Sequence, residues 1–102
     1  MLPKFILPET MNCIEIKEPG EPEVLISAKR PVPSPTANEV LVKVEAAGIN
    51  GPDLMQRRGL YPLKKLPIEV GMEASGLVLE IGKNVTNFKP GDKVCHCMNI
   101  GS

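Results

Sequence analysis

Two polar residues in the middle of the chain, Asn50 and Tyr61, carry hydrogen-bond donors that could stabilise negative charge on an oxygen atom. An amide N–H or a phenol O–H beside a carbonyl oxygen favours a transition state in which that oxygen gains charge, and it needs no metal ion. Simpler roles also fit, because asparagine often caps a helix and tyrosine often packs a loop. The residues alone leave both interpretations open.

The segment Cys95-His96-Cys97 raises the question of a metal site. In a strand, Cys95 and Cys97 share one face and His96 points away from it. Two ligands are too few for zinc, and Cys13 is the one further cysteine that could act as a third. We interpret the cysteines as ordinary core or surface thiols. Their odd number gives no disulfide framework and favours a reducing cytoplasm.

Other motifs are weaker. The pairs Arg57-Arg58 and Lys64-Lys65 could attract a cofactor phosphate, although such charges are usually just solvated. The scattered glycines form no dinucleotide-binding fingerprint, and the single histidine leaves no Ser-His-Asp set.

Twelve basic residues balance twelve acidic ones, and aromatic residues are few, which argues against nucleic-acid binding. No apolar run approaches the length of a membrane span, so we expect no membrane partner.

Short elements separated by turns must position these side chains. Eleven prolines and nine glycines favour strands and turns over long helices. A short helix fits residues 51–58, with Asn50 as its N-cap, Pro52 in its first turn and Gly59 at its end. An extended loop is expected over Arg30–Asn38, because it holds three prolines. The expected strands are Met11–Lys17, Val24–Lys29, Glu39–Glu45, Ala74–Ile81 and Lys93–Met98. This pattern predicts an antiparallel barrel or sandwich with one small helix.

Five segments, taken in their order and spacing, resemble the N-terminal, GroES-like half of zinc-free quinone oxidoreductases. These enzymes are the zeta-crystallin-like branch of the medium-chain dehydrogenase/reductase superfamily. The segments are Lys17–Val24, Glu39–Val44, Ala47–Asn50, Asp53–Tyr61 and Pro90–Val94. The resemblance implies a mainly β fold, a GroES-like, partly open antiparallel barrel with one short helix. It also implies an N-terminal arm of residues 1–10, a substrate-side domain of residues 11–102, and no Rossmann domain in this chain.

The resemblance further implies a truncated part of a cytoplasmic, NADPH-dependent enzyme that transfers hydride to a quinone. Asn50 would be both a catalytic and a cofactor-binding residue near the nicotinamide, and Tyr61 would be a catalytic residue near the quinone. Two alternatives stay open. One is an enoyl or alkenal reductase of the same superfamily, and the other is a non-catalytic GroES-like interaction module.

Zinc alcohol dehydrogenases of the same superfamily have cysteine where this chain has Asn50 and histidine where it has Met72. Neither an amide nor a thioether is a normal zinc ligand, so we expect no zinc. The chain also has no glycine-rich turn to hold a pyrophosphate, and we expect it to be inactive alone. Apolar residues near Leu60, Tyr61 and Met72 are expected to face water, which would favour a homodimer.

Overall fold

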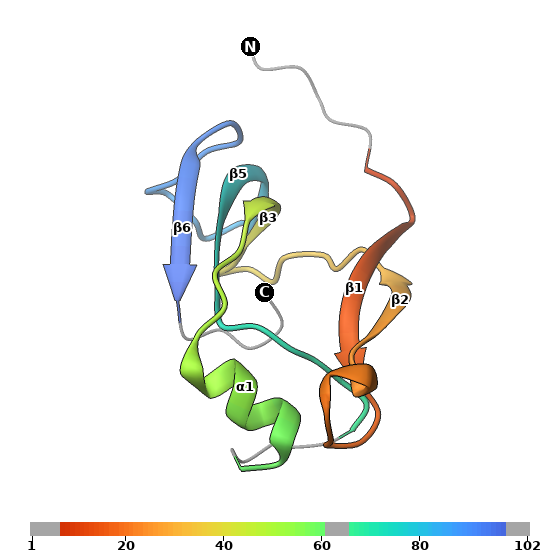
Figure 1. The fold of residues 1–102 in the computed structure, drawn as a ribbon. Helices are drawn as coiled ribbons and strands as arrows, with labels where there is room; N and C mark the ends of the chain where they lie inside the picture. The colour runs from red at the N-terminus through yellow and green to blue at the C-terminus, as the bar shows by residue number, and fades with distance from the viewer. Residues whose placement is uncertain (1–6, 61–65, 98–102) are drawn as a thin grey trace.

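The computed structural model of the protein describes residues 7–60 and 66–97. This part of the chain consists of strands, one short 3-10 helix and one α-helix (Figure 1). The elements are β1 (Thr10–Ile16), η1 (Pro22–Val24), β2 (Ile26–Pro31), β3 (Val40–Ala46), α1 (Gly51–Arg58), β4 (Ile68–Glu69), β5 (Glu73–Ile81) and β6 (Lys93–Cys97). The predicted mainly β fold with one short α-helix is confirmed.

The strands form two antiparallel sheets of three strands each. One has the order β2-β1-β4 and the other has the order β3-β5-β6. The two sheets stand apart, and α1 lies at the end of the second sheet where β3 runs into it (Figure 1). The described strands do not close into a barrel, which agrees with a partial GroES-like fold.

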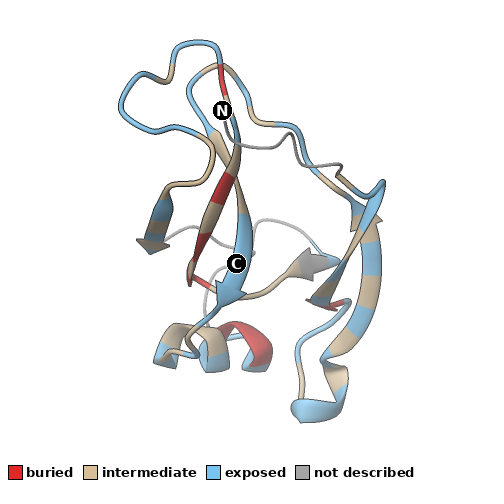
Figure 2. Ribbon diagram, turned by 90° about the horizontal axis from the view of Figure 1, so that it is seen from above, coloured by how far each residue is buried: buried red, intermediate tan, exposed pale blue. Residues whose placement is uncertain are grey.

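The core of the second sheet follows the alternation of β5. Ala74, Gly76 and Val78 are buried on one face, whereas the residues between them are only half-buried. Figure 2 shows these buried stretches along the central strand and another in α1. Side chains two apart in a strand share a face, so this alternation is the pattern of a strand with one packed side. Met72, just before the strand, is also buried.

The predicted strand boundaries are shifted by one residue in most strands and by two in the second strand. The second strand begins at Ile26, because Pro22 starts a 3-10 turn in which the Leu25 N–H donates to the Pro22 carbonyl at 3.1 Å. The same strand continues to Pro31, so the expected extended loop starts later than predicted. A proline is tolerated there because β2 is an edge strand of its sheet. The strand β4 was not predicted, and Met98, the expected end of β6, lies outside the described residues.

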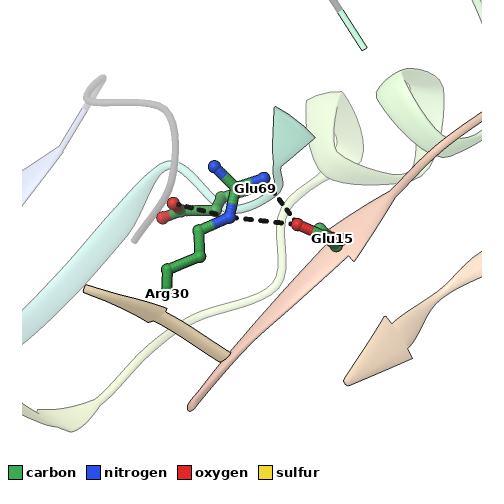
Figure 3. Close-up of polar contacts among 3 residues, drawn as sticks. All are labelled: Glu15, Arg30 and Glu69. Carbon is green, nitrogen blue, oxygen red and sulfur yellow. Dashed lines mark hydrogen bonds and ion pairs between the residues drawn. The ribbon is translucent and has the colours of Figure 1, made fainter. Parts of the chain in front are cut away.

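A charged cluster joins all three strands of the first sheet (Figure 3). Glu15 on β1 and Glu69 on β4 are directly opposite each other, an arrangement in which like charges repel. Arg30 on β2 lies between them, with its Nε 3.0 Å from Glu15 Oε2 and 3.3 Å from Glu69 Oε1. The hydrogen bond to Glu15 is the main cause that raises the pKa of Arg30 above its ordinary value. The guanidinium thus holds the two carboxylates together at the short pairing of β1 with β4.

The helix α1 has the predicted bounds, because both of its ends are locally encoded. Asn50 is the N-cap in extended conformation, and Pro52 lies in the first turn. Gly59 ends the helix in the left-handed region with φ 80°, where glycine has no steric penalty. Its N–H donates to the Gln56 carbonyl at 3.1 Å, and the Leu60 N–H donates to the Met55 carbonyl at 2.8 Å.

Candidate functional site

The predicted site residue Asn50 lies at the corner where β3 leads into α1. Its backbone N–H donates to Asp53 Oδ2 at 2.8 Å, and its carbonyl accepts from the Asp53 N–H at 3.1 Å. These two hydrogen bonds fix the turn from strand to helix. Asn50 itself is half-buried, so part of it reaches the surface at this corner. A side-chain donor on a fixed backbone suits stabilisation of charge on an oxygen atom.

A carboxylate that the sequence reasoning missed, Glu73, lies at the same corner. β3 and β5 are paired up to Ala46 and Ser75, which brings the residues that follow β3 beside the first residues of β5. A Cβ added to Gly48 would be 1.8 Å from Glu73 Oε1, so the carboxylate lies directly against the Gly48 backbone. The corner therefore places one acidic side chain against Gly48, which precedes Asn50 by two residues. Only the register of the two strands could have revealed this neighbour.

Tyr61, the second predicted site residue, lies outside the described residues, as does the pair Lys64-Lys65. The helix between Asn50 and Gly59 has eight residues. At a rise of about 1.5 Å per residue, its two ends are about 12 Å apart. The described part of the site is therefore the N-terminal end of α1 with its strand neighbours.

Buried polar atoms gather along one side of α1. Gln56 is fully buried, and neither its Oε1 nor its Nε2 has a hydrogen-bond partner among the described residues. Asp53 Oδ1, one helical turn earlier, is likewise buried without a partner. Residues three apart on a helix are neighbours on its surface. Buried polar groups are normally hydrogen-bonded, so these atoms mark a polar strip along α1.

Arg57 has a structural role, whereas the sequence suggested either a solvated charge or a contact to a cofactor phosphate. Its residue exposure is only 5%, so it is neither solvated nor available to a cofactor phosphate. Its Nη1 donates to the Gly20 carbonyl at 2.8 Å, and its own carbonyl accepts from the Gly20 N–H at 2.7 Å. Two hydrogen bonds therefore tie α1 to the turn before η1. Arg58, its neighbour in sequence, is exposed.

We expect Arg57→Met to lower the free energy of unfolding by about 1.5–3 kcal/mol, because the Gly20 carbonyl loses a charged donor. The methionine keeps most of the buried volume, so the effect reports the hydrogen bond. Arg58→Met is the matched control, and as an exposed substitution it should stay within about 0.5 kcal/mol. Urea unfolding followed by circular dichroism measures both. Equal stabilities of the two variants would remove Arg57 from this role.

Met72 was expected to face water, and this expectation is wrong: its exposure is 5%. It precedes β5 and is in phase with the buried residues of that strand, whereas Leu60 is 68% exposed as expected. Within residues 7–60 and 66–97, no group of three or more histidine, cysteine, aspartate or glutamate side chains could hold a metal ion. Cys95 and Cys97 are exposed, and Cys13 is half-buried.

A shallow depression of about 560 Å³ lies at the other end of β5 from Glu73. Its walls come from the segments 34–37 and 80–83. It is remote from Asn50 along the sheet, so it adds nothing to the corner. In the described ranges, no helix is long and apolar enough to cross a membrane.

Known proteins resemble this chain in both sequence and structure. The family model of the alcohol dehydrogenase GroES-like domain matches residues 36–102. Quinone oxidoreductase from Lama guanicoe is 41% identical over 86 residues, which are 82% of this chain and 26% of that protein. Acryloyl-coenzyme A reductase from Metallosphaera sedula is 45% identical over 62 residues, which are 61% of this chain and 19% of that protein.

A solved structure shows the same likeness in three dimensions. Escherichia coli quinone oxidoreductase, crystallised in complex with NADPH, matches with a TM-score of 0.84 at 39% sequence identity. The match covers 86% of this chain and 27% of that one. The chain therefore spans about a quarter of the length of the quinone oxidoreductases that it matches.

Proposed function

We propose that this chain, which belongs to the alcohol dehydrogenase GroES-like domain family, is the substrate-side part of an NADPH-dependent quinone oxidoreductase. The observation that carries this proposal is the match to the NADPH-bound Escherichia coli enzyme, with a TM-score of 0.84 at 39% identity. Quinone oxidoreductase from Lama guanicoe supports it at 41% identity. In this proposal, residues 11–102 are the domain and residues 1–10 are an arm that precedes it.

In the proposed reaction, the chain's own donors act on the acceptor oxygen. NADPH, when bound, supplies a hydride. The amide of Asn50 would lie beside the nicotinamide, carried on the turn from β3 into α1, whose backbone is hydrogen-bonded to Asp53. The hydroxyl of Tyr61 donates to the quinone carbonyl oxygen, where negative charge develops. A donor aimed at that oxygen lowers the barrier because the interaction strengthens in the transition state.

The residues present fit one wall of a dinucleotide site rather than a whole site. The half-buried amide of Asn50 offers both a donor and an acceptor, which suits the carboxamide of a nicotinamide. A pyrophosphate normally needs a glycine-rich turn that opens a helix, and the described residues provide none. The remaining wall must come from a second domain.

Metal ions have no place in the proposed chemistry. By the resemblance, Asn50 and Met72 stand where the zinc relatives carry ligands, and Met72 is buried. An amide and a thioether do not bind zinc well.

Three free cysteines fit a reducing compartment, and we place the enzyme in the cytoplasm. The exposed side chains of Ile49 and Leu60, near the ends of α1, fit self-association into a dimer.

An enoyl or alkenal reductase is the second candidate. The acryloyl-coenzyme A reductase of Metallosphaera sedula, at 45% identity over 62 residues, favours it. Both reactions place negative charge on a carbonyl oxygen after hydride addition, so the same donors at Asn50 and Tyr61 would serve either one. The two activities differ in the acceptor, which is a quinone in one and an enoyl thioester in the other.

The test compares this chain with a chimera in which it replaces the matched 27% of Escherichia coli quinone oxidoreductase. Residues 1–102 alone should neither bind NADPH tightly nor reduce a quinone, because hydride transfer requires both reactants to be held in place. The chimera should bind NADPH and oxidise it with a quinone as acceptor, in the presence of a metal chelator.

Three results would change the assignment. Turnover by the isolated chain would show a complete site within 102 residues. Faster turnover of an enoyl thioester than of a quinone by the chimera would favour the second candidate. A chimera that binds NADPH but turns over neither acceptor would support the non-catalytic interaction module. A calorimetric titration with NADPH precedes the kinetics, so that loss of folding is separated from loss of catalysis.

A further inference from the structure

Two exposed thiols share one face of the strand β6. Cys95 and Cys97 are exposed, whereas Val94 and His96, which alternate with them, are half-buried. β6 is an edge strand of the sheet β3-β5-β6 among the described strands. The thiols are therefore open to solvent both above the sheet and along its edge.

The register of β6 with β5 defines what surrounds the thiols. Cys95 is opposite Ser75, and Cys97 is opposite Glu73. Residues directly opposite in antiparallel strands share a face. The carboxylate of Glu73, however, lies against the backbone of Gly48 on the other side of β5. The two sulfurs are therefore the soft ligand atoms that β6 presents on this face.

The spacing of the cysteines disfavours a disulfide and suits a bridging ion. Residues two apart in a strand are separated by about 6.6 Å, and their Cβ atoms by a similar distance. A disulfide requires a Cβ separation of about 3.5–4.5 Å, so Cys95 and Cys97 cannot form one without distorting the strand. Two metal–sulfur bonds of about 2.3 Å span about 4.6 Å between sulfurs. Two same-face side chains reach this distance by rotating toward each other.

We propose that Cys95 and Cys97 form a two-thiolate site for a soft monovalent metal ion, of which Cu(I) is the biological example. Soft thiolate ligands select Cu(I), whereas zinc takes four ligands and the described residues hold no group of three or more. On binding, each thiol loses its proton to solvent, and the ion forms one bond to each sulfur. No electron is transferred, so the step needs no oxidant or reductant.

The site is independent of the proposed oxidoreductase function. It uses neither Asn50 nor Tyr61, and it needs only the strand β6 within its sheet. Cys13 provides an internal reference, because it is a half-buried thiol on β1 in the other sheet. A simple reaction of any thiol with copper would involve Cys13 as well.

The experiment is an anaerobic titration of the chain with Cu(I) in competition with a chromophoric Cu(I) chelator. We expect one tightly bound Cu(I) per chain. Cys95→Ser and Cys97→Ser should each weaken binding by about 100-fold or more, because a second tethered ligand typically contributes that factor. Cys13→Ser should bind as the unaltered chain does. Circular dichroism confirms that each variant keeps its strands.

A transplanted thiol tests the geometry. Lys93 is exposed and lies two residues before Cys95, on the same face of β6. Adding Lys93→Cys to Cys97→Ser should restore tight binding, since it rebuilds the same spacing one step along the strand. The proposal would be overturned if Cys97→Ser bound Cu(I) unchanged, if Cys13→Ser alone abolished binding, or if the transplanted pair did not bind.

Discussion

A Gly76→Ala variant is expected to lose about 3 kcal/mol or more of its free energy of unfolding, the upper range for an overpacked site. Gly76 lies in the middle of β5, opposite Val44 on β3 and Val94 on β6. An added Cβ would be 1.9 Å from the carbonyl oxygen of Lys43 and 2.8 Å from its carbonyl carbon. Both atoms belong to the backbone of β3, so no side chain can turn aside to make room.

The close approach has a visible cause in the sheet. The register of β3 with β5 shifts between Val44 and Ala46, which inserts an extra residue and bends β3 toward its partner. Glycine within a strand is typical of such a position. A methyl group there would push β3 away from β5, and β3 leads directly to Asn50. The loss of 3 kcal/mol would be a large share of the stability of a small domain.

Gly51→Ala is the matched control. No atom lies within 4 Å of the Cβ that this change would add at the first position of α1. Alanine in a helix is favoured over glycine by about 0.5–1 kcal/mol, so Gly51→Ala should keep or raise the stability. Urea unfolding followed by circular dichroism measures both variants. A stable Gly76→Ala protein would mean that β3 and β5 are not packed as closely as described.

The sequence predicted those elements whose limits are determined by the residues at their ends. α1 was predicted with its bounds, because Asn50, Pro52 and Gly59 each act on the backbone next to them. The alternation of β5 was equally local, and the buried face at Ala74 and Val78 follows from it. Such signals need no knowledge of what packs against them.

The elements that were missed depend on distant partners. β4 has only two residues and exists because it pairs with β1. No periodic pattern can show in so short a segment. The ion pairs of Arg30 with Glu15 and Glu69 cross three strands, so they required the sheet order. Whether the two sheets close into a barrel is likewise decided by packing, which composition does not contain, and the described strands do not close.

The candidate site shows the same division. The position of Asn50 at the corner of α1 was predicted, because a helix N-cap is a local feature. Glu73 was missed as its neighbour, since only the pairing of β3 with β5 brings it against Gly48. The burial of Met72 and Arg57 was also missed, because an isolated side chain type does not report what covers it. The roles of Asn50 and Tyr61 stay predictions.

Loss of one donor hydroxyl should nearly abolish catalysis by the chimera described above. We expect Tyr61→Phe to lower kcat by about 100- to 1,000-fold, the usual effect of removing one donor to a developing oxyanion. The ring stays in place, so KM for the quinone should change little. A selective fall in kcat indicates an interaction made only in the transition state. Steady-state kinetics with NADPH in excess provide the two constants.

Asn50→Asp completes the test at the other donor. Aspartate is as good an N-cap as asparagine, so α1 should keep its start and the turn held by Asp53. The amide N–H is lost and a negative charge is added beside the nicotinamide, so we expect both weaker NADPH binding and a fall in kcat of at least about 100-fold. Glu23→Gln, an exposed change on η1, serves as the control and should leave both unchanged.

The two variants together separate catalysis from architecture. If Tyr61→Phe and Asn50→Asp both retain full turnover, the two residues have only structural roles. Asn50 then caps α1, and Tyr61 packs a loop. If Asn50→Asp alone loses turnover together with NADPH affinity, the corner positions the cofactor and the oxygen is stabilised from elsewhere. A fall in kcat for Tyr61→Phe with unchanged NADPH affinity assigns the developing charge to the hydroxyl of Tyr61, because no other property of that side chain has been altered.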